Sequence, residues 1–334
     1  MTTFALLVLV ITAALIFTYT NGFYDTANTI ATVVSTGVLR PRTAVLMAAT
    51  LNVAGAFAGT AVAATIGRDL IDPASVTLTL VLAALVGAIA WTLFTWYFGI
   101  PSSSSHALVG GLVGATWVSA GRDHILRGGI DKVVKALVLS PFLGFGAAFV
   151  AMIAVYWIVR RMPPNRINIV FRRLQLCSSA LVAFSHGTND AQKSMGVITM
   201  ALVATQSAPT DLGNFPVPLW VTVASAAAMG LGTAMGGWRI IQTMGTKIFK
   251  LRPIHGFVAE TAAASVIQFC SVYGLPTSTA HCITSAIMGA GATTRLSAVS
   301  WGVTRGIAVA WLLTIPASAL IGAGAYKVCV ALHL

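Results

Sequence analysis

NGFYDTAN at residues 21–28 and HGTNDAQK at residues 186–193 each place one aspartate inside a long apolar segment. A carboxylate in the hydrocarbon of a bilayer costs about 2.5 kcal/mol or more, so an acid in that position is a functional-site hypothesis by default. Asp25 and Asp190 occupy matching places in the two halves of the chain. They therefore predict a transport site built by a repeat.

A second pair of motifs follows the first, GIPSSSSH at residues 99–106 and GLPTSTAH at residues 274–281. Proline suits the first turn of a helix, so each motif predicts a helix that begins at membrane depth. The free amides of a helix N-terminus carry partial positive charge and bind anions. Because Gly22 and Gly187 directly precede the acidic residues, we also expect the acidic motifs to interrupt their helices.

The composition indicates an all-α polytopic membrane protein. Hydrophobic residues make up 57% of the chain and charged residues only 8%, whereas a soluble domain carries about 25% charged residues. At about 20 residues per span, the apolar runs predict about ten transmembrane helices. We expect residues 1–20 to form an uncleaved first helix. The cysteines are expected to be ordinary buried thiols without metal or disulfide spacing: Cys177, Cys270, Cys282 and Cys329.

The spacing of the motifs predicts two inverted-topology repeats with broken helices. The interval from Asp25 to Asp190 is nearly the same as the interval from Pro101 to Pro276, which indicates an internal duplication. About five spans in each half would reverse the orientation of the second half. The predicted units are residues 1–160, a basic cytoplasmic linker at 161–173, and residues 174–334.

The net charge of +12 does not indicate nucleic-acid binding, because the basic residues lie in short loops between apolar runs. Loops that precede even-numbered predicted helices hold more than twice as many lysines and arginines as the other loops. The positive-inside rule therefore predicts that these loops are cytoplasmic and that both termini lie outside.

Only three of the eight acidic residues lie in apolar segments, namely Asp25, Asp190 and Glu260. The others are expected in solvated loops: Asp69, Asp72, Asp123, Asp131 and Asp211. A helix-capping role is the alternative for the two aspartates, and their doubling favours a site. Glu260 matches Leu85 of the first half, and it is either a functional acid or an interhelical hydrogen-bond partner.

Two carboxylates would repel an anion unless a proton or a metal ion lay between them. The pair therefore predicts cation symport, with Asp25 and Asp190 as candidate metal ligands. Hydroxyls of the proline motifs are candidate donors to a tetrahedral oxyanion, although they could also serve helix packing: Ser102, Ser103, Ser104, Thr277, Ser278 and Thr279. Each motif histidine is either structural or part of a proton relay: His106, His186 and His281.

At these motifs the chain resembles the inorganic phosphate transporter (Pit) family, of the bacterial low-affinity phosphate permease type. The resemblance includes ATVVST at 31–36, GGWRIIQTMG at 236–245 and LRPIHGF at 251–257. It implies a non-enzymatic symporter for inorganic phosphate, located in a bacterial inner membrane and assembled as a homodimer. The family's signature and substrate-facing residues correspond to Asp25, Asn28, Asn189, Asp190, Ser103, Ser104, Ser278 and Thr279.

Two residues depart from the repeat. Tyr24 stands where the second half has Asn189, and Lys193 stands where the first half has Asn28. An ammonium donates three hydrogen bonds and accepts none, so Lys193 cannot ligate sodium. The resemblance to bacterial proteins with a similar Asp-x-Gln-Lys run implies proton coupling, with phosphate carried as a neutral complex of Mg²⁺ or Ca²⁺. No permanently bound cofactor is expected.

Several alternatives stay open on the sequence. Sulfate is the nearest alternative substrate, although it stays unprotonated and has less use for Asp25 and Asp190. A sodium-coupled phosphate symporter is the second alternative. An anion channel could also use hydroxyl-lined helix ends. An intramembrane hydrolase is disfavoured, because a catalytic triad needs one asymmetric set of residues and this chain has two similar sets.

Overall fold

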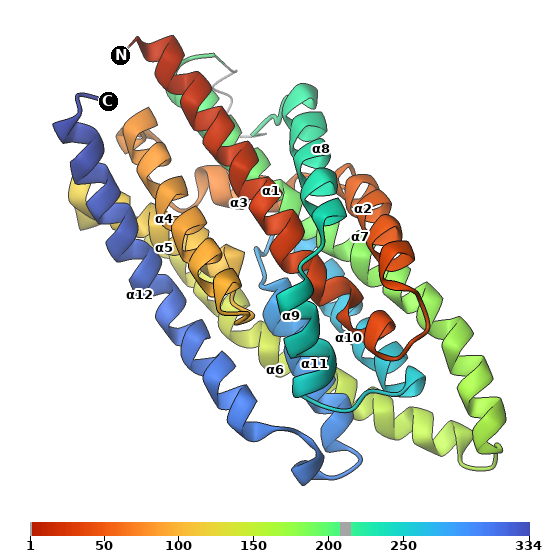
Figure 1. Ribbon diagram of the computed structural model, residues 1–334. Helices are drawn as coiled ribbons and strands as arrows, with labels where there is room; N and C mark the ends of the chain where they lie inside the picture. The colour runs from red at the N-terminus through yellow and green to blue at the C-terminus, as the bar shows by residue number, and fades with distance from the viewer. Residues whose placement is uncertain (1, 208–214) are drawn as a thin grey trace.

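The computed structural model describes residues 2–207 and 215–334, without the side chain of residue 26, so Asp211 lies outside the described residues. The first half contains α1 (Thr3–Ser35), α2 (Pro41–Ala56), α3 (Ala61–Arg68), η1 (Pro73–Ser75), α4 (Leu78–Tyr97), α5 (Ser104–Ser119), η2 (Arg122–His124) and α6 (Arg127–Val159). The second half contains α7 (Pro164–Ala204), α8 (Leu219–Met235), α9 (Trp238–Gln242), the π-helical η3 (Thr243–Lys247), α10 (Pro253–Val272), α11 (Thr279–Ala292), η4 (Leu296–Ala298) and α12 (Trp301–Ala331). Figure 1 shows the long helices running roughly alongside one another.

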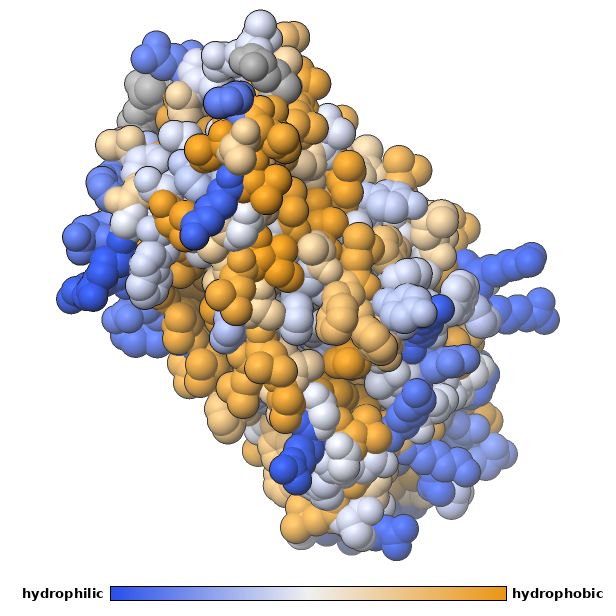
Figure 2. All heavy atoms as spheres, turned by 60° about the vertical axis from the view of Figure 1, so that its left-hand side comes forward, coloured by the Kyte–Doolittle hydropathy of each residue, from blue (hydrophilic) through white to orange (hydrophobic). Residues whose placement is uncertain are grey.

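The predicted fold class, an all-α polytopic membrane protein, is confirmed. Among the described residues, five helices are long and apolar enough to span a membrane, and two bent pairs could raise the number to seven. The pairs are α2 with α3, bent by 70°, and α8 with α9–η3, bent by 62°. Figure 2 shows hydrophobic side chains over the middle of one face and hydrophilic side chains toward its ends.

Two helical hairpins account for the short predicted spans. The segment before α4 meets the segment after α5 at an Ile71–Ile125 bridge. In the second half, the Ser300 amide donates to the Ile248 carbonyl at 2.9 Å, which joins the segments before α10 and after α11. Each hairpin therefore enters and leaves at one end of the molecule. With 16 and 14 residues, α5 and α11 are too short to cross a bilayer.

The two hairpins enter from opposite ends. Helix α12 begins beside the α10–α11 hairpin at Ser300. Beyond its other end, the Leu334 carbonyl accepts a hydrogen bond from Thr79 near the start of α4, at 2.8 Å. Figure 1 shows both chain termini at this second end. The hairpin tips therefore approach each other inside the bundle, in the inverted arrangement that the motifs predict.

Backbone features recur at the same spacing as the proline motifs. Gly99 and Gly274 have φ values of +65° and +63°, and Pro141 and Pro316 lie inside α6 and α12. The interval within each pair equals the interval between the two motif prolines. The division into units at 1–160 and 174–334 stays a prediction. Most of the predicted linker, from residue 164 onward, lies in the first turns of α7.

The prediction that Gly22 and Gly187 interrupt their helices is wrong, because α1 and α7 run through both acidic motifs. The glycines serve close helix packing instead. A Cβ at Gly22 would lie 2.5 Å from the Met229 carbonyl oxygen of α8, and one at Gly187 would lie 2.2 Å from the Asn52 carbonyl oxygen of α2. An interior packed to this density leaves no space for a methyl group.

Two smaller predictions also need correction. Cys177 is exposed on α7, whereas Cys270, Cys282 and Cys329 are buried free thiols as expected. A thiol behaves as a small hydrophobe, so it suits an outward apolar face. Asp131 lies in α6 and not in a loop. It is nonetheless solvated, and its carboxylate lies 4.0 Å from the Lys135 ammonium one turn later.

Candidate functional site

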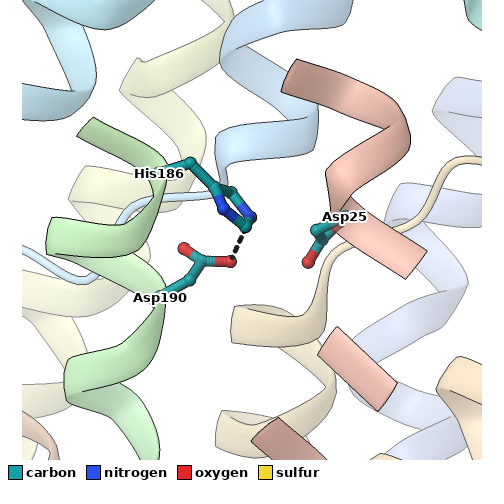
Figure 3. Close-up of side chains that lie close together, drawn as sticks. All are labelled: Asp25, His186 and Asp190. Carbon is teal, nitrogen blue, oxygen red and sulfur yellow. Dashed lines mark ion pairs between the residues drawn. The ribbon is translucent and has the colours of Figure 1, made fainter. Parts of the chain in front are cut away.

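The two motif aspartates meet in the middle of the bundle. Asp25 on α1 faces His186 and Asp190 on α7, as Figure 3 shows. One carboxylate oxygen from each aspartate and one ring nitrogen of His186 all lie within 4.8 Å of one another. The exposed fractions of Asp25 and Asp190 are only 1% and 0%. The structure thus brings together, away from solvent, two acids that belong to opposite halves of the sequence.

Asp190 has its own positive partner. The Lys193 ammonium lies 2.7 Å from Asp190 Oδ1, one helical turn away, and both side chains are fully buried. His186 Nε2 lies 3.4 Å from the other carboxylate oxygen of Asp190. Removing one member of such a buried pair would leave an uncompensated charge in the interior. Lys193 therefore neutralises the carboxylate of the second half from within the protein.

Asp25 has neutral hydrogen-bond donors instead. Asn28 Nδ2 donates to its Oδ1 at 2.8 Å, and the Ser104 hydroxyl donates to its Oδ2 at 2.8 Å. The nearby Lys193 ammonium is engaged by Asp190. The site therefore contains two carboxyl groups and one lysine ammonium. One further positive charge at the site would neutralise the second carboxylate.

The residues on α1 and α7 that surround the acids match one another. Asn21 corresponds to His186 and Asn28 corresponds to Lys193, both at the same spacing as the two aspartates. Asn21 is fully buried, and neither its amide nitrogen nor its oxygen has a hydrogen-bond partner among the described residues. Sequence reasoning did not select Asn21. Its position four residues before Asp25, on the same helix face, is the signal that could have identified it.

Each proline motif opens a helix that points at this site. The Ser103 hydroxyl accepts a hydrogen bond from the His106 amide at 3.2 Å, and the Ser278 hydroxyl accepts one from the His281 amide at 3.2 Å. Both serines are therefore N-caps, of α5 and α11. The predicted helix starts are found, but the prolines lie two residues before the caps because serine, not proline, closes the first turn.

Two roles of the motif hydroxyls are repeated in both halves. Ser103 and Ser278 cap the helices, whereas Ser104 and Thr279 lie on the acids. Thr279 Oγ1 donates to Asp190 Oδ2 at 3.4 Å, as Ser104 does to Asp25. Ser102 instead lies 2.9 Å from the Thr314 hydroxyl of α12, and Thr277 Oγ1 lies 3.8 Å from the Cys282 thiol. Neither Ser102 nor Thr277 contacts an aspartate through its hydroxyl in these hydrogen bonds, so the substrate-binding role predicted for both stays a prediction.

The two hairpin tips touch each other beside the acids. The Ser105 hydroxyl donates to the Thr277 carbonyl at 2.8 Å. The rings of His106 and His281 lie 4.6 Å apart between centroids, and His281 stacks on Trp311 of α12 at 3.8 Å. These contacts give both histidines a packing role, and a proton-relay role stays a prediction.

Tyr24 and Asn189 have the same structural task, although one replaces the other in the repeat. Tyr24 OH donates to the Ile100 carbonyl at 2.7 Å, and Asn189 Nδ2 donates to the Leu275 carbonyl at 3.4 Å. Each accepting residue directly precedes a motif proline. Both side chains thus position the hairpin tip of their own half. Asn189 Oδ1 is buried without a hydrogen-bond partner among the described residues, so this atom is the part of Asn189 that could face a ligand.

Glu260 forms a separate polar cluster on α10. Its carboxylate accepts hydrogen bonds from Thr32, from Gln175 at 3.1 Å and from Ser178. Thr32 lies seven residues beyond Asp25 along α1, which is about 10 Å at the rise of a helix. The matched Leu85 belongs to an apolar cluster. Glu260 therefore forms interhelical hydrogen bonds, as one of its two interpretations expected. Its role in cation binding stays a prediction.

The chemistry of the central site suits a cation and an oxyanion together. Two carboxylate oxygens and an imidazole nitrogen could ligate a divalent metal, since hard cations prefer oxygen and many transition metals accept imidazole. The N-termini of α5 and α11 offer partial positive charge. The predicted site residues are buried, none being more than 2% exposed. The site is thus closed toward both ends of the molecule.

Comparison with known proteins gives concordant matches. Residues 21–322 match the model of the family described as the phosphate transporter family. The chain is 48% identical to a protein of Rhizobium meliloti (strain 1021), over 97% of this chain and 96% of that protein. It is 46% identical to a protein of Bacillus subtilis (strain 168), over 96% of both chains. Both relatives are named "Probable low-affinity inorganic phosphate transporter".

One solved structure has the same fold. It is described as "The sodium-dependent phosphate transporter" and superposes with a TM-score of 0.89, covering 99% of this chain and all of that chain. The identity between the two sequences is 24%, so this likeness concerns the fold.

Proposed function

Because this chain belongs to the phosphate transporter family, we propose that it imports inorganic phosphate into bacteria by symport with a cation. The proposed coupling ion is the proton, and the proposed cargo is the neutral complex of phosphate with a divalent metal ion. Each cycle would then carry one net positive charge inward. The protein acts as a transporter and not as an enzyme.

The unbalanced carboxylate of Asp25 is the observation that carries this proposal. Asp190 is neutralised by Lys193, whereas Asp25 is held by the neutral groups of Asn28 and Ser104. Burying an ion without a partner is unfavourable. A proton on Asp25 or a cation beside it would remove this cost and the repulsion of an incoming anion. Cation and anion therefore favour each other's binding, which is the physical basis of symport.

Lys193 supports the proton as coupling ion. It occupies the position that Asn28 holds in the first half, and its ammonium lies where an amide oxygen could otherwise ligate sodium. A fixed ammonium replaces one exchangeable cation. It also attracts phosphate as a hydrogen-bond donor, together with the N-termini of α5 and α11.

The arrangement of charge supports an orientation in the membrane. Arg172 donates to the Gly37 carbonyl at 2.8 Å, so the segment after α1 and the start of α7 lie at the same end. The α1–α2 connection and the α6–α7 junction at this end contain seven arginines: Arg40, Arg42, Arg160, Arg161, Arg166, Arg172 and Arg173. We propose that this end faces the cytoplasm and that both termini lie outside. A homodimer in the plasma membrane completes the proposal, on the strength of the family resemblance.

Competition for uptake tests the substrate. We expect purified protein in liposomes to take up radiolabelled phosphate, and arsenate to inhibit this uptake strongly because it has the same shape and protonation chemistry. Sulfate in equal excess should leave uptake close to the uninhibited rate. Strong inhibition by sulfate and none by arsenate would contradict phosphate as the substrate and favour a sulfate permease.

A further inference from the structure

The closed site requires segments that open toward each end of the molecule. The helical segments that follow the two bends, α3 and α9–η3, lie where they could open the site. Helix α3 packs against α10, and α9 packs against α4, so each segment lies on the hairpin of the other half. Helix α3 leads to the end where the chain terminates, and η3 leads to Ile248 at the opposite end. Figure 1 shows α3 and α9 on different levels of the bundle.

One threonine in each segment holds the opposite hairpin tip. Thr65 Oγ1 of α3 donates to the Gly274 carbonyl at 2.7 Å, and Thr243 Oγ1 of η3 donates to the Gly99 carbonyl at 3.0 Å. Both glycines have positive φ and stand two residues before a motif proline. The same hydrogen bond therefore occurs twice, once toward each end, and each bond joins one half of the chain to the other.

Further contacts pack each segment against the hairpin of the other half. A Cβ at Gly274 would lie 2.9 Å from the Ala61 carbonyl oxygen, so α3 touches the tip closely. On the other side, the Arg239 side chain donates to the Tyr97 carbonyl. Its guanidinium lies 5.4 Å from the centroid of the Trp96 ring and 5.1 Å from that of the Tyr97 ring, within cation–π range.

Gln192 connects α3 to the acidic site. Its Oε1 accepts hydrogen bonds from the amides of Val62 at 2.8 Å and Ala63 at 3.3 Å, at the beginning of α3. These amides lack partners within their own helix. Gln192 follows Asp190 by two residues and precedes Lys193 by one. A shift of α7 at the site would therefore move the cap of α3.

The contact between α1 and the start of α9 differs from the contact between α7 and α3. Ala27 stands at the position that matches Gln192. There a Cβ at Gly237 would lie 2.4 Å from the Phe23 carbonyl oxygen, so the start of α9 rests directly on α1. Gly236, at φ +69°, provides the kink before α9. Each segment thus follows a bend, packs against the helix that carries an aspartate, and donates a threonine hydrogen bond to the hairpin tip of the other half.

We propose that α3 and the α9–η3 segment are the two gates of the site, and that Thr65, Thr243 and Gln192 are the positioning residues that close them. This inference rests on the proposed transport function. Releasing Thr65 from Gly274 opens the site toward the end that carries the chain termini. Releasing Thr243 from Gly99 opens it toward the opposite, basic end. Because the bonds join the halves, relative movement of the halves can break one while keeping the other.

Side-specific labelling tests the gates. The reporter is Ser105→Cys at the contact between the tips, in a chain whose four native cysteines are replaced by serine or alanine. A membrane-impermeant maleimide is applied to right-side-out and to inverted vesicles without phosphate. We expect Thr65→Val and Gln192→Met to raise the labelling rate about fivefold from the termini side only. Thr243→Val should raise it about fivefold from the basic side only, which corresponds to a lost hydrogen bond of about 1 kcal/mol.

Three further variants serve as matched controls. Thr246→Val lies on the same segment as Thr243, but Thr246 bonds to the Gln242 carbonyl of its own segment, so this variant should label as the reporter parent does. Thr65→Ser and Thr243→Ser keep the hydroxyl and should also match the parent. Equal labelling from both sides, an increase from the wrong side, or no increase in the valine variants would overturn the proposal.

The labelling assay separates the gates from the substrate. It needs no transported phosphate, so the predicted side-specific pattern in a protein that fails to take up phosphate would contradict the proposed function alone. Phosphate uptake that survives in the valine variants with parental labelling would contradict the gates alone.

Discussion

Asp25→Asn is expected to reduce the initial rate of phosphate uptake by at least about 100-fold, which corresponds to about 2.7 kcal/mol. The amide keeps the size of the side chain, yet it can neither take up a proton nor neutralise a metal ion. The donor groups of Asn28 and Ser104 also lose their charged acceptor, and hydrogen bonds to charged groups contribute about 1.5–3 kcal/mol each. Initial uptake of radiolabelled phosphate into liposomes measures this effect.

Two comparison variants sharpen the Asp25 experiment. Asp131→Asn makes the same chemical change at an exposed position of α6, where the side chain is 73% accessible, and it should leave uptake unchanged. Asp190→Asn should also abolish uptake, because it leaves the Lys193 ammonium buried without its partner. An Asp25→Asn protein that is inserted normally and retains half of the wild-type uptake would contradict a role for Asp25 in cation coupling.

Lys193→Asn is expected to abolish uptake in sodium-free medium and to make the remaining uptake dependent on sodium. The change copies the first half, where Asn28 stands at this position. It removes the fixed ammonium from Asp190 and supplies an amide oxygen, so the site must bind a soluble cation instead. Loss of the buried partner predicts a fall of about 100-fold or more without sodium, at about 3–5 kcal/mol.

Uptake measured over a series of sodium concentrations at constant ionic strength checks the Lys193 prediction. Lys327→Asn, which changes an exposed lysine of α12, should behave as wild type does. A wild-type protein that already requires sodium would show that Lys193 does not replace it, and the proposed proton coupling would then be wrong.

The sequence predicted that the two aspartates meet because the same motif occurs in both halves. A carboxylate in an apolar segment is costly, and two of them at matching places in a repeat require a common explanation. Asp25 and Asp190 accordingly bring one carboxylate oxygen each within 4.8 Å of the other, together with a ring nitrogen of His186. The starts of α5 and α11 were predicted from the proline motifs, although Ser103 and Ser278 and not the prolines cap these helices.

Other features depend on neighbours that a single sequence does not reveal. Gly22 and Gly187 read as helix breaks, whereas they admit the backbones of α8 and α2. The hairpin helices α5 and α11 have the same apolar composition as a full span, so hydropathy could not distinguish the two. Tyr24 and Asn189 differ in size and chemistry, and only their shared acceptors, the carbonyls before the prolines, reveal their common task.

Glu260 shows the limit of reasoning from the cost of burial. It is an acid in an apolar segment, as Asp25 is, and the same argument marked it as a site residue. Three hydrogen bonds from α1 and α7 satisfy its carboxylate. The matched Leu85 lies among apolar residues, so the repeat holds no second copy of this polar cluster around Leu85. A repeat identifies the shared site, but it does not predict what each half adds to it.

Voltage-driven uptake tests most directly whether a cation travels with the anion. Liposomes without sodium but with Mg²⁺ receive an interior-negative potential from potassium and valinomycin, at equal pH on both sides. Wild-type protein should accumulate radiolabelled phosphate above its external concentration, and Asp25→Asn should not. An interior-negative potential that slows phosphate entry, as expected of an anion channel, would contradict the proposed proton symport, and so would accumulation that occurs only when sodium is added.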